Sequence, residues 1–330
     1  MRAQRHRDGE MYMGRRIALA MAALAIVWQA TGCGRPNPPA DSSVPAVSAG
    51  KTIGAALLTQ THVFYQDMVS ALQEECRKHG FKLILQYADF DSSKQNNHIE
   101  TFVIQKVDAL IVAPNDSAGI APVIADARAK GIPVFTVDIA AHGANVVSHI
   151  ASDNVMGGEL VGEYLAKAMG GKGKVAIVDH PAVASVQDRV AGFEKAIARY
   201  PDIRIVQKVP GEGQRDKAFR AAQDLVQANP DLNGIFAIND DSALGTLAAV
   251  EAAGAQNRII IVGYDGTPEA REAILKGTAL KADTVQHPKE IGRQAIQAIA
   301  AYLAGKPVPP VIPVKVDIID QASLKAESSK

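Results

Sequence analysis

The stretch from Ala109 to Asp138, ALIVAPNDSAGIAPVIADARAKGIPVFTVD, decides the fold of this chain. It begins and ends with short apolar runs, Ala109–Pro114 and Ile132–Asp138, and the segment between them has helical spacing. A continuous apolar run is typical of a strand buried in a parallel sheet, and a helix between two such strands makes the crossover. The stretch therefore predicts a strand–helix–strand unit of an α/β fold.

The same alternation recurs from Lys51 onward, with amphipathic stretches between further apolar runs. These runs are Thr52–Leu58, Lys82–Tyr87, Lys174–Val178, Ile203–Lys208, Gly234–Asn239 and Ile259–Tyr264. Strand–helix alternation indicates a doubly wound parallel sheet. Eight such strands exceed what one mononucleotide-type half needs, so we expect two similar lobes that meet at a cleft.

Polar residues directly follow several predicted strands: Asp138, Asn239 and Asp265. In open parallel sheets, ligands bind at the carboxyl ends of the strands, which makes these three side chains site candidates. Asp and Asn are also favoured as helix N-caps. The spacing alone leaves both interpretations open.

The charge balance bears on the kind of partner. The 330 residues include 35 Lys and Arg and 35 Asp and Glu, so the formal net charge is zero. No long-range field would draw such a protein to nucleic acid, and we expect no nucleic-acid partner. An uncharged small molecule is the natural ligand.

The N-terminus has the pattern of an export signal. Arg15 and Arg16 precede an apolar run from Ile17 to Trp28, which is too short to span a membrane. Small residues leading to Cys33 resemble a bacterial lipoprotein signal, which implies acylation of that cysteine and a membrane anchor. Ala30 departs from the lipoprotein pattern, so cleavage by signal peptidase I remains an alternative.

We therefore expect residues 1–33 to be a signal peptide and residues 34–50, rich in Pro, Ser and Ala, to be a disordered tether. The protein would then lie in the periplasm or cell envelope, anchored to the membrane by lipid. With Cys33 acylated, Cys76 would be a lone thiol.

Motifs for catalysis or cofactor binding are incomplete. Gly170–Lys174 looks like a phosphate loop, but Val175 stands where Ser or Thr would hold magnesium. Gly211-Glu212-Gly213 lacks the third glycine of a dinucleotide fingerprint. There is no Gly-x-Ser-x-Gly or His-Glu-x-x-His motif and no paired-cysteine metal motif. We expect no enzyme, no cofactor and no metal.

Four ordered motifs together resemble the ribose-binding branch of the periplasmic sugar-binding proteins. They are Val147–Asn154 followed by Gly157-Gly158, Arg189-x-x-Gly192-Phe193, Ile238-Asn239-Asp240 with Ala243-Leu244-Gly245, and Val262–Pro268. The resemblance runs from about Lys51 to about Val316. Lactose-repressor-like transcription factors share the fold, but they carry a DNA-binding helix-turn-helix where this chain has its export signal.

The resemblance implies a type I periplasmic binding protein, with two lobes joined by three crossing segments. The N-terminal lobe would comprise residues 51–152 and 287–313, the C-terminal lobe 153–286 and 314–322, and residues 323–330 a tail. The crossings would lie near Ser152–Asp153, Gln286–His287 and Pro313. The family also implies a monomer that delivers a sugar to the permease of an ABC importer by hinge closure.

The same resemblance implies a ligand pocket. Phe64 and Tyr65 match the aromatic pair that stacks on the sugar, because sugar C–H groups present an apolar face. Asp138, Arg189, Asn239, Asp265 and Gln286 match the residues that bind hydroxyl groups. Thr59 and His62 complete the set.

The pocket departs from the ribose pattern at several positions. His62 and Ala113 replace asparagines, Ile139 replaces an arginine, and the second-lobe aromatic is missing near Gly213. Because a site that lacks specific donors does not favour the same sugar, another pentose, a ketose, a furanose or a polyol is expected. Two alternatives remain: a sensory protein that docks on a chemoreceptor or sensor kinase, and a binder of a furanone or nucleoside.

Overall fold

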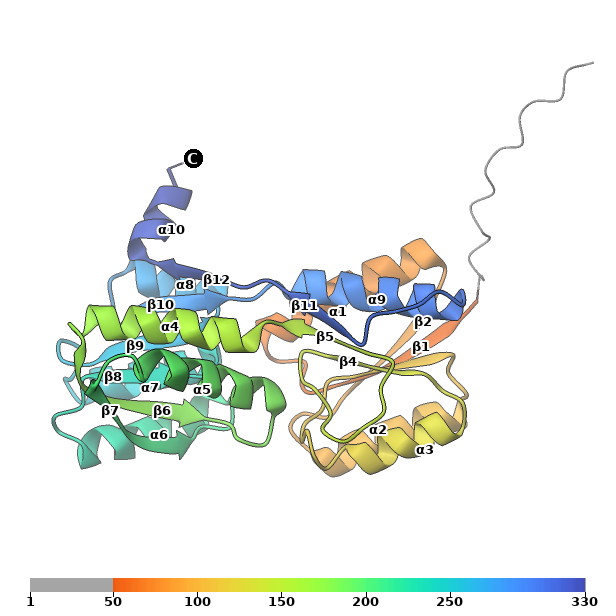
Figure 1. Cartoon of the computed structure of the whole chain (residues 1–330), viewed down its shortest axis with the longest axis horizontal. Coiled ribbons are helices and arrows are strands. Elements are labelled where there is room, and N and C mark those ends of the chain that lie inside the picture. The colour runs from red at the N-terminus through yellow and green to blue at the C-terminus, as the bar shows by residue number, and fades with distance from the viewer. Residues whose placement is uncertain (1–49, 330) are drawn as a thin grey trace, which may run out of the picture. The chain divides into compact units, whose positions relative to one another are not determined.

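The computed structural model describes residues 50–329, drawn in colour in Figure 1. The predicted signal peptide, most of the predicted tether and Cys33 lie outside the described residues. Among the helices of the described part, none is long and apolar enough to cross a membrane.

The first lobe contains a six-stranded sheet with the order β11-β5-β4-β3-β1-β2, and all of its strand pairs are parallel. The strands are β1 (Thr52–Leu57), β2 (Lys82–Tyr87), β3 (Ala109–Val112), β4 (Val134–Val137), β5 (Ser148–Ser152) and β11 (Val311–Val314). Central strands β1, β3 and β4 are almost wholly buried, which agrees with their continuous apolar runs.

Four helices flank this sheet, two on each face (Figure 1). They are α1 (Val63–His79) and α9 (Pro288–Leu303) on one face, and α2 (Ser92–Ile104) and α3 (Ala121–Ala129) on the other. Helices α1 and α9 pack closely because Gly292 has no side chain: a Cβ there would lie 2.5 Å from the carbonyl oxygen of Met68.

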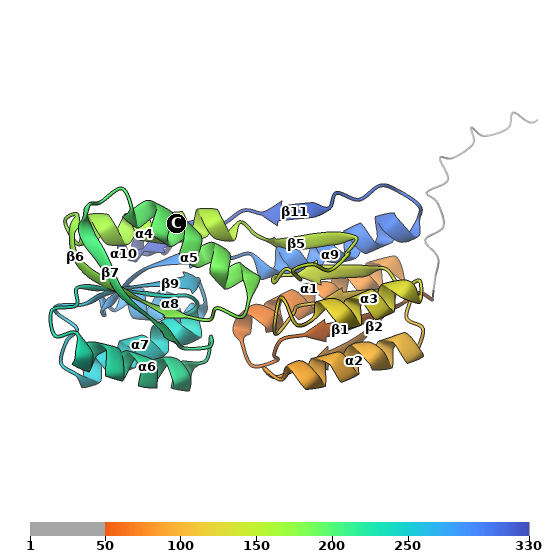
Figure 2. The same cartoon turned by 60° about the horizontal axis from the view of Figure 1, so that its bottom comes forward.

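The second lobe repeats the arrangement with the strand order β12-β10-β9-β8-β6-β7 (Figure 2). Its strands are β6 (Lys172–Asp179), β7 (Asp202–Pro210), β8 (Gly234–Ala237), β9 (Ile260–Asp265), β10 (Leu280–Val285) and β12 (Asp317–Asp320). Only β12 is antiparallel to its neighbour in this sheet.

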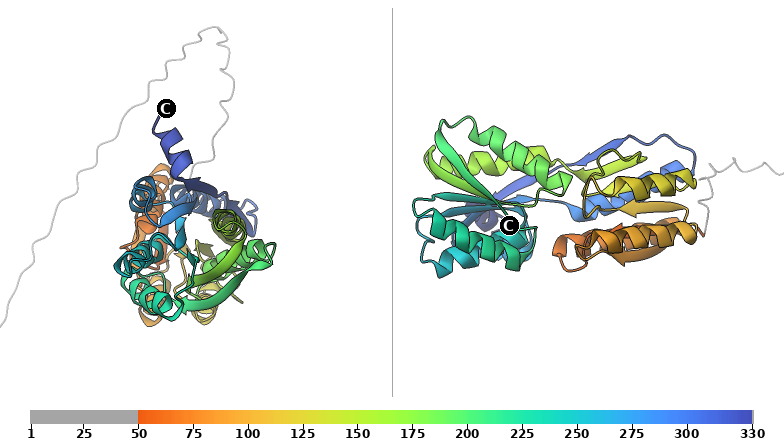
Figure 3. Two further views of the ribbon diagram at one scale, coloured as in Figure 1. Left: turned by 90° about the vertical axis from the view of Figure 1, so that its left-hand side faces the viewer. Right: turned by 90° about the horizontal axis from the view of Figure 1, so that it is seen from below.

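The helices of the second lobe flank its sheet in the same way (Figure 3). They are α4 (Asn154–Ala168), α5 (Ala184–Ile197), α6 (Arg215–Ala228), α7 (Asp240–Ala252), α8 (Pro268–Leu275) and α10 (Gln321–Glu327). Pairs α4–α5 and α6–α7 pack against each other on opposite faces. The two-lobed, doubly wound α/β fold predicted from the apolar runs is confirmed.

The chain passes between the sheets three times: from β5 to α4, from β10 to α9, and from β11 to β12. The third passage follows Val314, which pairs with Ser152 in the first sheet. The sequence had placed Val314 in the second lobe, but its backbone continues the ladder with β5. The remaining lobe limits stay predictions.

The C-terminal residues from 323 onward, expected to be a tail, include most of α10. Asp320 and Ser323 form a capping box at the start of this helix, and Leu324 is buried. Gln321 Nε2 also donates a hydrogen bond of 2.9 Å to the Leu275 carbonyl, so the helix is attached to the second lobe.

All eight predicted apolar runs form strands, whereas β5, β10, β11 and β12 lie outside those runs. The missed strands carry polar residues or proline, as in β10, where Asp283 and Thr284 are fully buried. A buried polar residue interrupts the apolar run from which a central strand is predicted.

Candidate ligand-binding site

A cavity lies between the two lobes, with about 420 Å³ of space not filled by protein atoms, including its open mouth. Eight of the nine ligand-site residues predicted from the sequence line it: His62, Phe64, Tyr65, Asp138, Arg189, Asn239, Asp265 and Gln286.

Thr59 is the predicted residue that does not line the cavity. Its buried hydroxyl lies 3.0 Å from the Thr61 hydroxyl and accepts a hydrogen bond from the Thr61 amide. This side chain stabilises the turn between β1 and α1, and so positions the aromatic residues that follow.

Asp138 reaches the cavity from the end of β4. Its backbone has φ +62°, a left-handed conformation that is uncommon for a residue with a side chain. The Tyr65 hydroxyl donates a hydrogen bond of 2.6 Å to Asp138 Oδ2. Burial raises the pKa of Asp138, while Arg189 and the Tyr65 hydrogen bond act in the opposite direction. One carboxylate oxygen, Oδ1, is left for a ligand.

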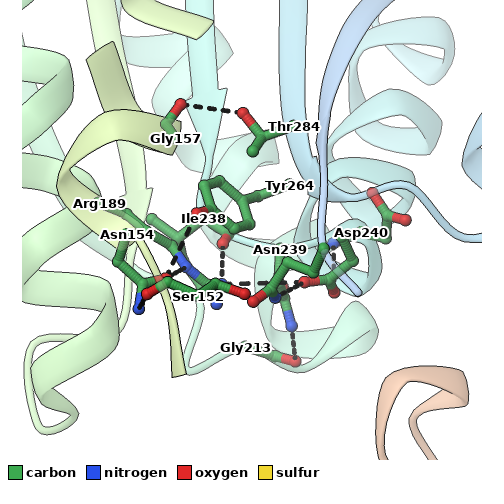
Figure 4. Close-up of polar contacts among 12 residues, drawn as sticks. Ser152, Asn154, Gly157, Arg189, Gly213, Ile238, Asn239, Asp240, Tyr264 and Thr284 are labelled. Atoms are coloured by element: carbon green, nitrogen blue, oxygen red, sulfur yellow. Dashed lines mark hydrogen bonds and ion pairs between the residues drawn. The ribbon is translucent and has the colours of Figure 1, made fainter. Parts of the chain in front are cut away.

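Arg189 lies on α5, and its side chain is buried instead of exposed on the helix surface. Its Nε donates to Asn154 Oδ1 at 2.9 Å and its Nη1 donates to the carbonyl of Ile238 at 2.8 Å (Figure 4). The guanidinium also lies over the Tyr264 ring, with Cζ 3.9 Å from the centroid. These contacts hold the guanidinium in one orientation at the cavity wall.

Two glycines allow α4 and α5 to approach closely enough to place Arg189. A Cβ on Gly158 would lie 2.0 Å from the carbonyl oxygen of Arg189, and one on Gly192 would lie 2.0 Å from that of Val155. No side chain fits at such distances. The glycines of the quoted motifs therefore serve helix packing that positions the cationic group.

Asp265 ends β9 with φ +131°, and Gln286 follows β10. The Gln286 Nε2 donates to Asp265 Oδ1 at 2.7 Å, and Arg189 Nη1 lies 3.9 Å from the same oxygen. Burial, and next the carboxyl of Asp240, raise the pKa of Asp265 to about 8. Gln286 Oε1 is buried and receives no hydrogen bond from any described residue, so it can accept one from a ligand.

Two further carboxyl groups lie behind Asp265. Oxygens of Asp240 and Asp283 lie 3.4 and 3.3 Å from the place that a Cβ on Gly263 would take. Both residues are buried, and burial raises the pKa of each. Asp240 Oδ2 accepts a hydrogen bond of 2.7 Å from the Thr267 amide. Sequence reasoning missed Asp283, because a single aspartate within a strand carries no motif.

Asn239 is a helix N-cap, which is the alternative role that the sequence left open for it. Its Oδ1 accepts a hydrogen bond of 2.9 Å from the Ser242 amide and so caps α7, and its Nδ2 donates to the Gly213 carbonyl at 3.1 Å (Figure 4). It also lines the cavity. The cap and the site position are compatible, because the helix begins at the carboxyl end of the strand.

His62 joins the lobes at the mouth of the cavity. Its Nε2 lies 3.0 Å from Asp241 Oδ2, and the Arg215 guanidinium contacts both Asp241 and Glu269. Burial lowers the pKa of His62, while the nearby Asp241 carboxylate acts to raise it. The ring also makes an edge-on contact with Phe90, with centroids 5.6 Å apart.

Phe64 and Tyr65 pack edge to face, with centroids 5.3 Å apart, and both belong to the hydrophobic core as well as to the cavity wall. Phe90, His180 and Ser185 also line the cavity and were not predicted as site residues. His180 carries no motif in the sequence. It follows the end of β6, and this strand-end position is the signal that could have identified it.

The residues that depart from the ribose pattern do not all lie at the cavity. Ile139 and Gly213 line the cavity, whereas Ala113 is fully buried and does not. A Cβ on Gly213 would lie 3.5 Å from His180 Nδ1. The imidazole of His180 therefore lies beside the position where the second-lobe aromatic is missing.

The chemistry of this site is that of a binder of hydroxyl groups. Asp138, Asp265 and Gln286 offer acceptors and Arg189 offers donors, so the wall can pair with groups that donate and accept at once. Among residues 50–329, no three His, Cys, Asp or Glu side chains are grouped so as to hold a metal ion.

Two doubly wound lobes with a cavity at the carboxyl ends of their strands define the type I periplasmic binding fold. Residues 53–307 match the family described as periplasmic binding protein domain, and the chain belongs to that family.

Known relatives agree with this assignment. The chain is 34% identical over 280 residues to the ribose import binding protein RbsB of Bacillus subtilis, covering 84% of this chain and 88% of the relative. A solute binding protein of Actinobacillus succinogenes with bound D-allose has a TM-score of 0.76 and 31% identity, covering 84% of this chain and 99% of that one. The fructose binding periplasmic domain of a hybrid two component system has a TM-score of 0.80 and 26% identity, covering 84% and 93%.

Proposed function

We propose that this protein is the extracytoplasmic substrate-binding component of an ABC importer and that it captures a monosaccharide or polyol by hinge closure. The observation that carries the proposal is the grouping of the buried Asp138, Arg189 and Gln286 with Asp265, whose side chain is 10% exposed, at one cavity beside the aromatic pair Phe64–Tyr65. Aromatic faces cover the C–H surface of a sugar, and charged groups bind its hydroxyls.

Contacts between the lobes support closure. The Ser117 hydroxyl in the first lobe accepts a hydrogen bond of 2.8 Å from the Ala184 amide in the second, and His62 contacts Asp241 at 3.0 Å. A ligand that touches both lobes binds the closed state better than the open one and shifts the population toward it. A single chain supplies both walls, so a monomer suffices.

The import role is supported by the names of the relatives, which include ribose import binding proteins and ABC transporter solute binding proteins. A permease of an ABC importer is therefore the proposed partner. The non-enzymatic role follows the same family, whose members bind and deliver their substrates.

The test of sugar binding is a thermal-shift screen of the purified protein against sugars, polyols, nucleosides and amino acids. A ligand present at a hundredfold excess over its Kd stabilises the folded state by about 2.7 kcal/mol. The expected result is a shift with at least one sugar or polyol that disappears in Asp138→Ala. A shift with a nucleoside alone would overturn the substrate class.

A sensory role is the second candidate, favoured by the similarity to the fructose binding domain of a two component system. The two roles share one site and differ in the partner. Deletion of the gene for the adjacent permease should abolish uptake of the bound ligand if the protein serves import. Uptake that persists while a sensor response is lost would favour the second role.

Membrane attachment through Cys33 is part of the proposal. Metabolic labelling with an alkyne fatty acid should mark the wild-type protein and leave Cys33→Ala unmarked, with the variant recovered in the soluble envelope fraction. Labelling of both proteins, or of neither, would contradict acylation at this cysteine.

A further inference from the structure

The cavity wall divides into a polar and an apolar part. The polar part is linked by the contacts Tyr65–Asp138, Arg189–Asp265 and Asp265–Gln286. The apolar part belongs to one contiguous hydrophobic cluster contributed by both lobes. Its members at the cavity are Leu58, Phe64, Ile139, Val183, Val186 and Ile238, with Phe90 packed against them.

The first lobe offers few polar atoms to a ligand. Of its cavity-lining residues, Asp138 has one oxygen engaged by Tyr65, and His62 contacts Asp241. Ile139, the residue after Asp138, is only 2% exposed and faces the cavity, at the position where the resembled ribose binders have arginine. Leu58 is also buried, with 6% of its surface exposed.

A hydroxyl pressed against these aliphatic side chains would lose its hydrogen bonds to water and gain none. A hydrophobic pocket disfavours a ligand that differs only by an added hydroxyl, by up to about 100-fold. A hydrogen atom or methyl group at the same place would instead be buried favourably against the cluster. The wall therefore discriminates between a fully hydroxylated sugar and one that lacks a hydroxyl on this side.

We propose that the ligand is a deoxy sugar whose hydrogen-bearing or methyl-bearing edge lies against Leu58, Ile139 and Val183, while its hydroxyls face Asp138, Arg189, Asp265 and Gln286. This inference rests on the proposed sugar-binding function and narrows its substrate class.

Isothermal titration calorimetry on matched pairs tests it. The pairs are D-ribose with 2-deoxy-D-ribose and 5-deoxy-D-ribose, D-galactose with D-fucose, and L-mannose with L-rhamnose. At least one deoxy sugar should bind at least tenfold more tightly than its parent. If every parent sugar with measurable affinity binds as tightly as its deoxy partners or more tightly, the inference is wrong, although the protein still binds sugars. If no sugar binds, the inference is wrong, and the proposed function then stands only if a polyol shifts the stability in the thermal-shift screen.

Two variants locate the preference in the apolar wall. Ile139→Arg introduces donors beside Asp138 and should reduce the preference for the deoxy sugar at least tenfold. Val183→Thr keeps the shape of the side chain and adds one hydroxyl, so it should reduce the preference severalfold even if the arginine variant fails to fold. A preference unchanged in Val183→Thr and in a folded Ile139→Arg would refute the assigned wall.

The control for the arginine variant is Ile104→Arg, the same substitution at the end of α2, where the side chain is 79% exposed. It should leave the ratio of affinities unchanged, because it lies outside the cavity. If Ile104→Arg changes the ratio of the affinities for the deoxy and parent sugars as much as Ile139→Arg does, the proposal is wrong.

Discussion

The Tyr65 hydroxyl donates a hydrogen bond of 2.6 Å to Asp138 Oδ2, and both side chains are buried in the wall of the same cavity. A phenol from α1 thus satisfies one oxygen of a carboxylate at the end of β4. One residue thus combines an aromatic ring in the wall of the proposed sugar site with a hydroxyl that orients the carboxylate beside it.

Tyr65→Phe should lower the free energy of unfolding by about 1–3 kcal/mol, because Asp138 loses its donor while it remains buried. Chemical denaturation of the ligand-free protein measures this change. Tyr302→Phe is the control, since Tyr302 is 38% exposed. Equal effects of the two substitutions would show that the hydrogen bond to Asp138 contributes nothing.

Arg189→Lys should weaken ligand binding at least tenfold although it keeps the charge. Lysine cannot reproduce the two directed bonds to Asn154 and Ile238, so the cationic group would lose its orientation. Calorimetry with the ligand found in the screen measures the loss. Arg199→Lys, at an exposed ion pair with Glu163, should have little effect on affinity.

Gly158→Ala should destabilise the protein by about 1–3 kcal/mol or more, because a methyl group would collide with the carbonyl of Arg189 and separate α4 from α5. Ligand affinity should fall together with stability, since the displaced helix carries Arg189. Glu159→Ala, at the neighbouring half-exposed position, should change both far less. A fully stable Gly158→Ala would contradict the close approach of the helices.

Asp283→Asn should make the protein more stable at high pH. Burial raises the pKa of Asp283 in the folded state, so above the ordinary carboxyl pKa of about 3.9 only the unfolded chain ionises freely. Its contribution to stability therefore falls as the pH rises from about 4 to the raised folded-state pKa. Asparagine does not ionise, so Asp283→Asn removes this loss of stability at high pH.

Urea denaturation of both proteins between pH 5 and pH 9 measures the effect. The stability of Asp283→Asn relative to wild type should increase with pH, by at most about 1.4 kcal/mol per pH unit. Asp224→Asn, exposed on α6, is the control. A difference between Asp283→Asn and wild type that stays flat over this range would show that Asp283 ionises normally.

His62→Leu should reduce the population of the closed state, because the contact of 3.0 Å with Asp241 joins the lobes at the cavity mouth. Losing a hydrogen bond to a charged group costs about 1.5–3 kcal/mol, or roughly 10-fold to 100-fold in apparent affinity. Small-angle X-ray scattering should show a larger radius of gyration at subsaturating ligand. His98→Leu, on α2, is the control. An effect of equal size there would show that the contact between His62 and Asp241 does not hold the lobes closed.

Some site residues could be predicted from strand-end position alone. Asp138 and Asp265 follow buried strands, and parallel strands bring their carboxyl ends to one edge of a sheet. Arg189 and Gln286 required the resemblance, because nothing in their local sequence separates a buried helix arginine from an exposed one. Phe90 lies in the turn after β2 and carries no motif, whereas His180 follows the end of β6 and could have been found by that position.

The sequence by itself determined the eight strands that are apolar runs and the alternation of strands with helices, because apolar runs and helical spacing are local properties of the chain, and it indicated an uncharged ligand. Only the tertiary structure decided that Asp283 lies buried beside Asp240 and that an apolar wall spans both lobes. These features depend on distances between residues far apart in the chain. Such distances are set when strands and helices pack within a lobe and when the two lobes meet, and no local pattern of residues encodes them.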